Sequence, residues 1–574
     1  MDQAQLFDIL SRYDRRKKYF RLKDGSFLDV SDGQLRELSA LKNGLQISDR
    51  ELKKGKTQVP AYRAMYLDSQ LKGGDLIKVE KDNAFRALIR NMQTMEEHKF
   101  QIPREQEKIL RSYQKEGFYW IKTLKHNQFG GILADDMGLG KTLQVITFLW
   151  SEFQESAPGE NRRAIVITPA SLVFNWMNEI ERFAPGLPAT VVTGDVKERK
   201  ALIKNAGERE VLITSYDLLK RDLKAYQNLD FAVQIIDEAQ YIKNHGTQVA
   251  KAVKEIRSEF RLALTGTPVE NRLSELWSIF DFLMPGFLYS YEKFRKEIEL
   301  PAVQYSNSDA MERLQKMIRP FVLRRLKRDV LKDLPDKLEK DMFSPLESEQ
   351  KELYEAHTER LRLMLGMQSD AEFRTSKLQI LAEITRLRQI CCYPGLVYEG
   401  YKGNSSKLEM CMELVQNAVN GGHKLLLFSQ FTTMLDVLAV RLKKAKVSFY
   451  MLTGSTSKEK RAQMVHAFNE DDTSVFCISL KAGGTGLNLT AADIVIHYDP
   501  WWNLAVQNQA TDRAHRIGQQ NVVSVYRLFM KDTIEERIRA LQERKRELAD
   551  EILSGEGIGQ ALISREEVLE LLGR

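Results

Sequence analysis

The sequence predicts an α/β protein with two parallel-sheet lobes and a helical region between them. Between residues 105 and 285, short continuous apolar runs alternate with stretches of helical character. A second series of the same kind follows between residues 405 and 530. Residues 286–400, which separate the two series, are charged and helical in character. Continuous apolar runs of this length are typical of strands buried on both faces of a parallel sheet, and the intervening helices complete β-α-β units.

The composition favours large folded lobes. The 574 residues are enough for about four domains. Hydrophobic residues make up 43% of the chain and charged residues 29%, which is typical of a globular rather than a disordered protein. The net charge of +7 permits a polyanionic partner, although an ordinary protein with excess lysine fits this value equally well.

Two classes of protein are disfavoured. The four cysteines form no C-x-x-C pair, which argues against a zinc site or a disulfide framework. The N-terminus lacks the apolar core of a signal peptide, and no apolar run reaches the ~18 residues that span a bilayer. We therefore expect a cytoplasmic protein with no membrane contact.

The predicted elements divide the chain into five parts. Residues 1–100 form an accessory region, in which "KKYFRLKDGSFLDV" alternates apolar and polar residues around Asp24-Gly25 and predicts a β-hairpin. Residues 101–300 form the first lobe, 301–400 a helical insertion and linker, 401–540 the second lobe, and 541–574 a helical tail. A Gly-Lys-Thr at Gly55–Thr57 follows no apolar strand, so we interpret it as a turn.

A phosphate-binding loop is predicted in the first lobe. The run "GGILAD" reads as a strand and "GKTLQVITFLW" as the start of a helix, which is the context in which Gly-Lys-Thr binds phosphate. Lys141 would reach the β- and γ-phosphates of a nucleotide, and the Thr142 hydroxyl would ligate Mg²⁺. Gly138 and Gly140 allow close approach of the backbone. The alternative is an ordinary turn between a strand and a helix.

The loop departs from the usual G-x-x-x-x-G-K-[ST] pattern. The first glycine of that pattern falls at position 135, where this chain has Asp135, followed by Asp136. Aspartate tolerates unusual backbone dihedrals better than most residues. We expect the loop to bind ATP, provided that both carboxylates point away from the γ-phosphate.

Two further acids end a predicted strand. The apolar run "FAVQIIDEAQ" places Asp237 and Glu238 at the carboxyl end of a strand, where parallel sheets bind ligands. Asp237 would hold Mg²⁺, and Glu238 would orient the attacking water. An acidic surface turn is the alternative for this pair alone, but the Gly-Lys-Thr loop upstream favours the catalytic interpretation.

Four motifs together resemble the Swi/Snf-type ATPases, a branch of the superfamily-two motors: "DDMGLGKTLQ", "DEAQ", "LTGTPVEN" and "QNQATDRAHRIGQ". The resemblance covers residues 105–545 and implies two RecA-like lobes with family-specific helical insertions. It also implies that ATP and Mg²⁺ bind in the cleft between the lobes and that double-stranded DNA lies across both.

The resemblance implies a role for individual residues. Those expected in catalysis are Lys141, Asp237, Glu238, Gln240, Arg513 and Arg516. Those expected to bind the nucleotide, with an adenine contact for the first, are Gln114, Asp136, Met137, Gly138, Leu139, Gly140, Lys141, Thr142 and Gly486. Those expected to hold Mg²⁺ are Thr142 and Asp237, and those expected to contact the DNA backbone are Thr214, Ser215, Ser429 and Thr453.

The two arginines are expected to act as arginine fingers. Arg513 and Arg516 lie three residues apart, so on a helix they would share one face. Because one lobe would hold the phosphates and the other would supply the guanidinium groups, the site would be complete only when the lobes close. An isolated pair with this spacing would instead be read as surface charges.

Other residues carry narrower expectations. Gln240 stands where many relatives have histidine, so we expect no histidine-like pH step in activity. We interpret Trp501 and Trp502 as packing or cleft-lining residues and His515 as a hydrogen-bonding partner. The basic stretch that contains Lys327 lies near the expected coupling region.

The sequence therefore predicts an ATP-dependent double-stranded DNA translocase that remodels or displaces DNA-bound complexes. The alternatives are a strand-separating helicase and a DNA-binding scaffold with an inactive ATPase. RNA polymerase or another DNA-bound complex is a candidate client. We expect a bacterial, nucleoid-associated protein that acts as a monomer and is a fragment of a longer chain, although the sequence itself does not fix the oligomeric state.

Overall fold

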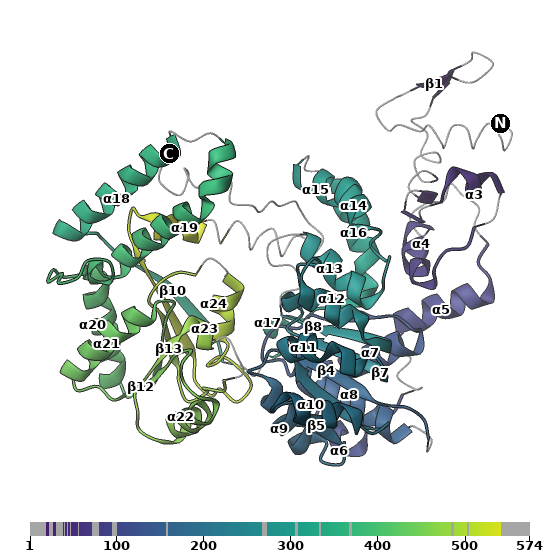
Figure 1. Cartoon of the computed structure of the whole chain (residues 1–574), viewed down its shortest axis with the longest axis horizontal. Coiled ribbons are helices and arrows are strands. Elements are labelled where there is room, and N and C mark those ends of the chain that lie inside the picture. Colours follow the sequence, from purple (N-terminus) through teal and green to yellow (C-terminus); the bar gives the residue numbers. More distant parts are fainter. Residues whose placement is uncertain are drawn as a thin grey trace.

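The chain folds into two α/β lobes that lie side by side in the computed structural model (Figure 1). The structure describes residues 19–21, 27–29, 38, 41–42, 44–45, 47–54, 57–71, 80–94, 100–155, 159–266, 273–304, 308–331, 335–366, 370–483, 487–501, 504–540 and 543. Within these ranges, no helix combines the length and the apolar character that a membrane span requires.

The first lobe is built on a seven-stranded sheet in the order β5-β6-β4-β7-β8-β3-β9, with every neighbouring pair parallel. Its strands are β3 (Gly131–Leu133), β4 (Ala164–Thr168), β5 (Ala189–Val191), β6 (Val211–Ser215), β7 (Asp230–Asp237), β8 (Arg257–Leu264) and β9 (Val322–Leu323). All residues of β4 and β6 are buried, as the continuous apolar runs predict.

Helices flank this sheet (Figure 1). They are α6 (Arg104–Glu107), α7 (Ser112–His126), α8 (Lys141–Glu155), α9 (Val173–Phe183), α10 (Val196–Lys204), α11 (Tyr216–Tyr226), α12 (Gln248–Glu255), α13 (Leu273–Leu283), α14 (Tyr291–Phe294), α15 (Leu300–Gln304) and α16 (Ser308–Ile318).

The second lobe is built on a six-stranded parallel sheet in the order β10-β15-β14-β11-β13-β12. Its strands are β10 (Lys337–Ser344), β11 (Leu425–Ser429), β12 (Phe449–Leu452), β13 (Val475–Ser479), β14 (Ile494–His497) and β15 (Val523–Met530). Successive residues of β11 enter different cores, Leu425 and Leu427 on one face and Leu426 and Phe428 on the other. The sheet is therefore buried on both faces.

The helices after the first sheet are α17 (Lys327–Val330), α18 (Ser348–Gly366), α19 (Asp370–Cys392), α20 (Ser406–Asn420), α21 (Thr432–Lys444), α22 (Lys458–Glu470), α23 (Leu480–Gly483) and α24 (Leu504–Thr511). Helices α18 and α19 pack as a pair beside the second lobe (Figure 1).

The range 301–400 contains more than the helices expected there. Strand β9 completes the first sheet and β10 forms an edge of the second. The first four residues of β10 are exposed, so an apolar run does not reveal this strand. Its eight-residue ladder with β15 and the ion pair between Asp341 Oδ1 and Arg527 Nε (2.6 Å) hold it in place.

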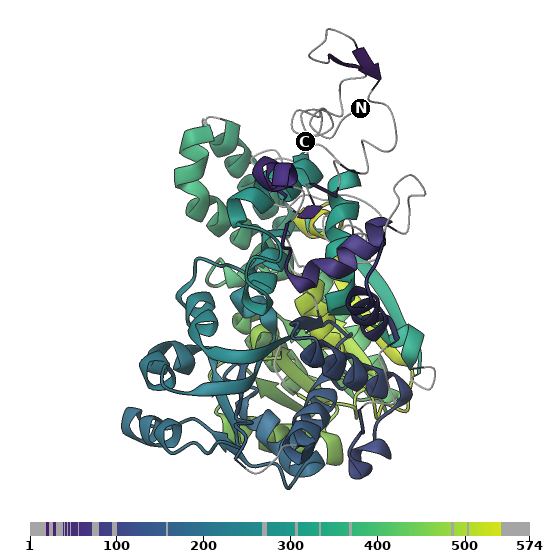
Figure 2. The same ribbon diagram turned by 90° about the vertical axis from the view of Figure 1, so that its right-hand side faces the viewer.

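The N-terminal region carries the predicted hairpin. Strands β1 (Tyr19–Arg21) and β2 (Phe27–Asp29) pair antiparallel, while Asp24 and Gly25 lie outside the described residues. Helices α3 (Asp49–Lys54), α4 (Ala64–Leu71) and α5 (Asn83–Thr94) follow, and α4 and α5 pack against α16 and α7 of the first lobe (Figures 1 and 2). The contact is specific, because Arg63 Nη2 donates to Phe287 O (2.5 Å).

Candidate active site

The predicted phosphate loop joins β3 to α8 at the carboxyl edge of the first sheet. Gly138 and Gly140 have φ values of 83° and 75°, a region that residues with a Cβ rarely adopt, so both glycines are required. Lys141 opens α8, and its ammonium donates to the carbonyl oxygens of Asp135 (2.6 Å) and Asp136 (3.4 Å). The loop carbonyls therefore bind the ammonium that is expected to bind the phosphates.

The two aspartates of the loop turn toward residues 325–327. Asp135 is fully buried and receives two bonds from the Arg325 guanidinium, Nε to Oδ1 (2.9 Å) and Nη2 to Oδ2 (2.5 Å). Asp136 Oδ2 accepts from the backbone N–H of Lys327 (3.0 Å). Both carboxylates are thus bonded to residues 325–327, whereas the Lys141 ammonium bonds backbone carbonyls of the loop.

Asp237 lies at the end of β7, close to the loop. Its Oδ2 accepts from Trp176 Nε1 (2.8 Å) and Thr168 Oγ1 (3.3 Å), and its Oδ1 from the Glu238 N–H (2.9 Å). Burial raises the pKa of this carboxyl, while the Trp176 hydrogen bond and the Lys141 charge lower it. Carboxylate and hydroxyl oxygens suit Mg²⁺, so Asp237 and Thr142 fit the metal that the sequence implies.

Glu238 is held by amides from both lobes. It adopts a left-handed backbone conformation (φ 53°), and burial followed by the Asp237 charge raises its pKa. Gln240 Nε2 donates to its Oε2 (2.7 Å), and Gln509 Nε2, from α24 of the second lobe, reaches its Oε1 (3.3 Å). Gln240 in turn accepts from the Thr265 hydroxyl (3.2 Å). Two amides therefore orient the carboxylate that is expected to position water.

Sequence reasoning missed Gln509. The residue stands inside the motif "QNQATDRAHRIGQ", four positions before Arg513, but the resemblance assigns roles there only to the arginines. Its partner Glu238 lies 271 residues earlier in the chain, so no local pattern indicates the contact.

The two arginines lie within the electrostatic influence of first-lobe acids, Glu238 for Arg513 and Glu179 for Arg516, but they stand beyond the end of a helix rather than on it. Helix α24 ends at Thr511, and Arg513 and Arg516 follow on turns. Burial lowers the pKa of Arg513 to about 10, with a further decrease from Arg516 and an opposing effect from Glu238. A Cβ added at Gly138 would lie 3.3 Å from Arg516 Cβ, so Arg516 is adjacent to the loop.

Gln114 also lies against the loop. Its Nε2 donates to Leu139 O (3.0 Å), and its Oε1 accepts from the Arg111 N–H (3.0 Å). Its amide keeps a second N–H and a second lone pair, which are the groups that an adenine contact would use.

The remaining nucleotide-binding residues are placed as follows. Leu139 is fully buried in a cluster with Tyr113 and Leu331. Met137 lies next to Gly266, where an added Cβ would be 3.1 Å from its Cγ. Thr142 is half-buried at the start of α8. Gly486 lies outside the described residues.

The four residues expected to contact DNA differ in their surroundings. Thr214 is fully buried, and Ser215 Oγ caps α11 by accepting from the Leu218 N–H (3.3 Å). Ser429 is fully buried, and its hydroxyl donates to Asp499 Oδ1 (2.6 Å). Of these four, only Thr453 has a partly exposed side chain, which pairs with Ser455 Oγ (2.9 Å). In this conformation Ser429 and Thr214 do not offer their hydroxyls to a ligand.

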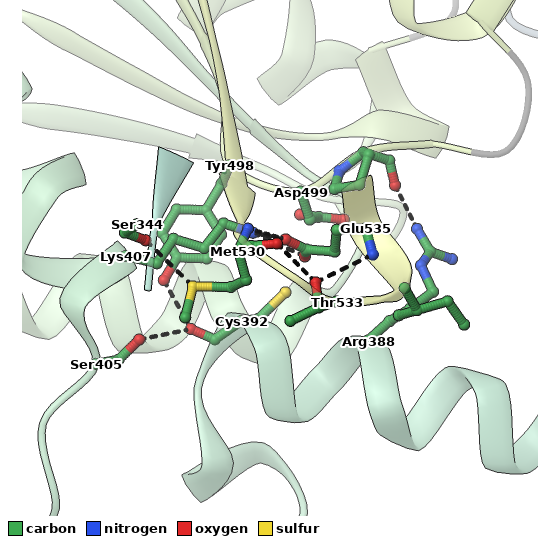
Figure 3. Close-up of polar contacts among 12 residues, drawn as sticks. Ser344, Arg388, Cys392, Ser405, Lys407, Tyr498, Asp499, Met530, Thr533 and Glu535 are labelled. Carbon is green, nitrogen blue, oxygen red and sulfur yellow. Dashed lines mark hydrogen bonds and ion pairs between the residues drawn. The ribbon is translucent and has the colours of Figure 1, made fainter. Parts of the chain in front are cut away.

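Asp499 belongs to a buried polar cluster of the second lobe (Figure 3). Lys407 Nζ donates to both carboxylate oxygens of Glu535 (2.7 Å each), and neither side chain is exposed. Arg388, near the end of α19, donates to Pro500 O, the carbonyl after Asp499. The cluster therefore ties the helical insertion, the end of β14 and the segment after β15 to one another.

The narrower expectations for Trp501 and His515 are confirmed. Trp501 is half-buried and packs against a core of the second lobe, whereas Trp502 lies outside the described residues. His515 Nε2 lies 2.9 Å from Pro335 O, so this histidine is a hydrogen-bonding partner.

Known protein families match most of the chain. A family model described as SNF2-related domain matches residues 113–396. One described as Helicase conserved C-terminal domain matches residues 406–518, and one described as Bacterial SNF2 helicase associated matches residues 1–103.

Individual relatives agree with these matches. The chain is 40% identical over 487 residues to an uncharacterized ATP-dependent helicase of Mycoplasma pneumoniae, covering 84% of this chain and 46% of that protein. It is 39% identical over 501 residues to the putative ATP-dependent helicase/translocase YwqA of Bacillus subtilis, covering 84% and 53%. The chain thus spans about half the length of the curated relatives it matches.

A solved structure is also similar in sequence. The Sulfolobus solfataricus SWI2/SNF2 ATPase core in complex with dsDNA is 37% identical, and the match covers 78% of this chain and 93% of that one, with a TM-score of 0.39. The family matches, the identity to relatives and the motifs at the contact between the lobes agree: the chain belongs to the Swi/Snf (SNF2-related) family.

Proposed function

We propose that the chain is the motor of an ATP-dependent double-stranded DNA translocase, which uses ATP hydrolysis to remodel or displace DNA-bound protein complexes. The observation that carries the proposal is that amides from both lobes hold Glu238 while Arg516 of the second lobe lies against the phosphate loop. Such a site is complete only when the lobes are closed, which couples the chemistry to lobe motion.

Each residue has a defined task in this mechanism. The Lys141 ammonium leaves its loop carbonyls and binds the β- and γ-phosphate oxygens. Thr142 and Asp237 would hold Mg²⁺, which neutralises phosphate charge when bound. Glu238, fixed by its two amides, orients the attacking water in line with the γ-phosphate. Arg513 and Arg516 stabilise the charge that spreads over the transferred group, an effect worth about 10³- to 10⁵-fold in rate.

The proposed DNA contacts are made to phosphates. They imply little sequence specificity and a strong dependence of binding on salt concentration. Thr453 is the predicted DNA contact whose side chain is accessible, so it is the first of the four to test. RNA polymerase or another DNA-bound complex remains the proposed client, and a monomer associated with the nucleoid remains the proposed state of the protein.

The test is ATP turnover with and without duplex DNA. We expect DNA to stimulate the wild-type chain and expect Lys141→Ala, Glu238→Gln and Arg516→Ala to abolish turnover. Lys56→Ala is a matched control, because it removes the lysine of the second Gly-Lys-Thr in the chain and should leave turnover unchanged. Wild-type turnover that does not respond to duplex DNA would contradict the proposal.

A strand-separating helicase is the second candidate, because the relatives carry the word helicase in their names. Two substrates separate the candidates. A translocase displaces the third strand of a DNA triplex without unwinding a forked duplex, whereas a helicase separates the fork.

A further inference from the structure

One residue of the segment that connects the two lobes, Lys327, contacts both the phosphate loop and residues 512–516, which we call the arginine-bearing turn. Strand β9 of the first sheet ends at Leu323, and β10 of the second begins at Lys337. Lys327 is the first residue of α17 on this connection, and Figure 1 shows α17 on the side of the first lobe that faces the second.

The first-lobe end of this connection is fixed to the loop. Asp136 N–H donates to Arg325 O (3.0 Å), and Asp136 Oδ2 accepts from the Lys327 N–H (3.0 Å). The Arg325 guanidinium adds its two bonds to the buried Asp135 carboxylate. The backbone of residues 325–327 therefore moves with the phosphate loop.

The side chain of Lys327 reaches the second lobe. Its Nζ donates to Asp512 Oδ1 (2.5 Å) and to His515 O (2.7 Å). Asp512 directly precedes Arg513, and His515 directly precedes Arg516. One ammonium thus holds the residue before each of the two arginines.

Between these two ends, the Lys327 side chain lies next to Gly138 of the phosphate loop. A Cβ added at Gly138 would lie 3.5 Å from Lys327 Cε and 3.6 Å from its Nζ. Lys327 is buried, and burial lowers its pKa, an effect that Asp512 opposes. An ammonium in such surroundings is retained only with close charged and polar partners.

We propose that Lys327 is a positioning residue, which holds the arginine-bearing turn of the second lobe in its place opposite the phosphate loop of the first. Its backbone is bound to one side of the cleft and its side chain to the other. When the lobes separate, its Nζ must leave Asp512 and His515, so its contacts favour the closed arrangement. This inference rests on the proposed ATPase function and adds a residue outside the expected catalytic, nucleotide-binding and DNA-binding sets.

The first measurement is steady-state ATP hydrolysis with duplex DNA. We expect Lys327→Met to lower kcat about 10- to 100-fold, because the arginines remain but are misplaced, with KM for ATP changed less than about threefold. Lys327→Arg keeps two donors within reach and should restore most of kcat. Lys254→Met is the matched control, because Lys254 pairs with Asp281 at the same 2.5 Å within the first lobe.

The second measurement does not depend on hydrolysis. Energy transfer between dyes on cysteines introduced at the exposed Lys200 and Lys443 reports the distance between the lobes, and the four native cysteines are buried. Without nucleotide, Lys327→Met and Asp512→Asn should each lower the transfer efficiency, and the double variant should lower it no further. Lys254→Met should match the wild type.

The outcomes are distinct. A wild-type chain without DNA-stimulated turnover contradicts the proposed function, and the dye measurement still decides the inference. If Lys327→Met has both the wild-type kcat and the wild-type transfer efficiency, the inference is overturned. If Lys327→Met and Lys254→Met reduce kcat equally, the effect is one of general stability and the inference is also overturned.

Discussion

Asp135→Gly would restore the usual first glycine of the phosphate-binding pattern, yet we predict that it destabilises the first lobe. The Asp135 carboxylate is fully buried, and the Arg325 side chain that it pairs with is only 9% exposed. The substitution leaves that guanidinium with neutral acceptors, Tyr113 O and Gln144 Oε1 (2.8 Å). Position 135 therefore carries the charge partner of Arg325, and its removal leaves a buried guanidinium without a carboxylate.

The expected loss follows from the burial. Removing one partner of a buried ion pair costs about 3–5 kcal/mol. The two neutral acceptors remain, and Glu116 lies 3.9 Å from Arg325 at an exposed position, so the cost should fall near the lower end, about 3 kcal/mol. The greater backbone freedom of glycine adds up to about 1 kcal/mol. We expect a total of about 3–4 kcal/mol.

Urea unfolding followed by tryptophan fluorescence can measure this loss. Of the six tryptophans, Trp120, Trp150, Trp176 and Trp277 lie in the first lobe. With a slope of about 3 kcal/mol per M urea, the loss moves the midpoint down by roughly 1 M. The double variant Asp135→Leu/Arg325→Met should recover most of the stability, because both charges are removed together. An Asp135→Gly midpoint equal to that of the wild type would refute the reasoning.

Three further predictions concern buried groups elsewhere. Burial, and then Arg527, lowers the pKa of His497 to about 3, below its unfolded value of ~6.5, so stability is lost as pH falls below ~6.5. The loss reaches about 2 kcal/mol at pH 5, and urea unfolding at pH 7 and pH 5 should show that His497→Gln removes it. Lys407→Met should cost about 3–5 kcal/mol in the same assay, and the added change Glu535→Leu should recover most of it, since both side chains are fully buried. Gln240→His should introduce a fall in ATP turnover below pH ~6.5 that the wild type lacks, because an amide does not titrate there.

The sequence predicts the elements whose strands are buried on both faces. The runs that became β4, β6, β11 and β13 are apolar except for one or two hydroxyl residues at the end of each, and in the structure every residue of each is buried. Strand β10 could not be found in this way, because its stability comes from a ladder with β15 and from charge pairs rather than from apolar burial.

The residues of the candidate site also fall into two groups, those that local sequence predicts and those that depend on packing between distant segments. Lys141, Asp237 and Glu238 follow apolar strands or a glycine-containing loop, and these local contexts predicted their places. Gln509 and Lys327 lie 271 and 185 residues from their partners Glu238 and Asp512, so only the packing of one lobe on the other brings each pair together. Ser429 is the converse case, because the resemblance implies a DNA contact while in this structure its hydroxyl is buried and donates to Asp499.

The two aspartates of the phosphate loop bind the segment that connects the lobes, which gives a reason for the missing glycine. An ordinary loop of this kind needs glycine at its first position only to let the chain turn, and nothing else binds there. In this chain the same position carries a carboxylate that anchors Arg325, and the next position carries one that anchors the Lys327 backbone. The side chain of that same Lys327 reaches the second lobe, where it binds Asp512 and His515. The departure from the pattern therefore supplies the attachment point through which a change at the phosphates can be passed to the connection, and restoring the glycine should weaken that coupling even where ATP still binds.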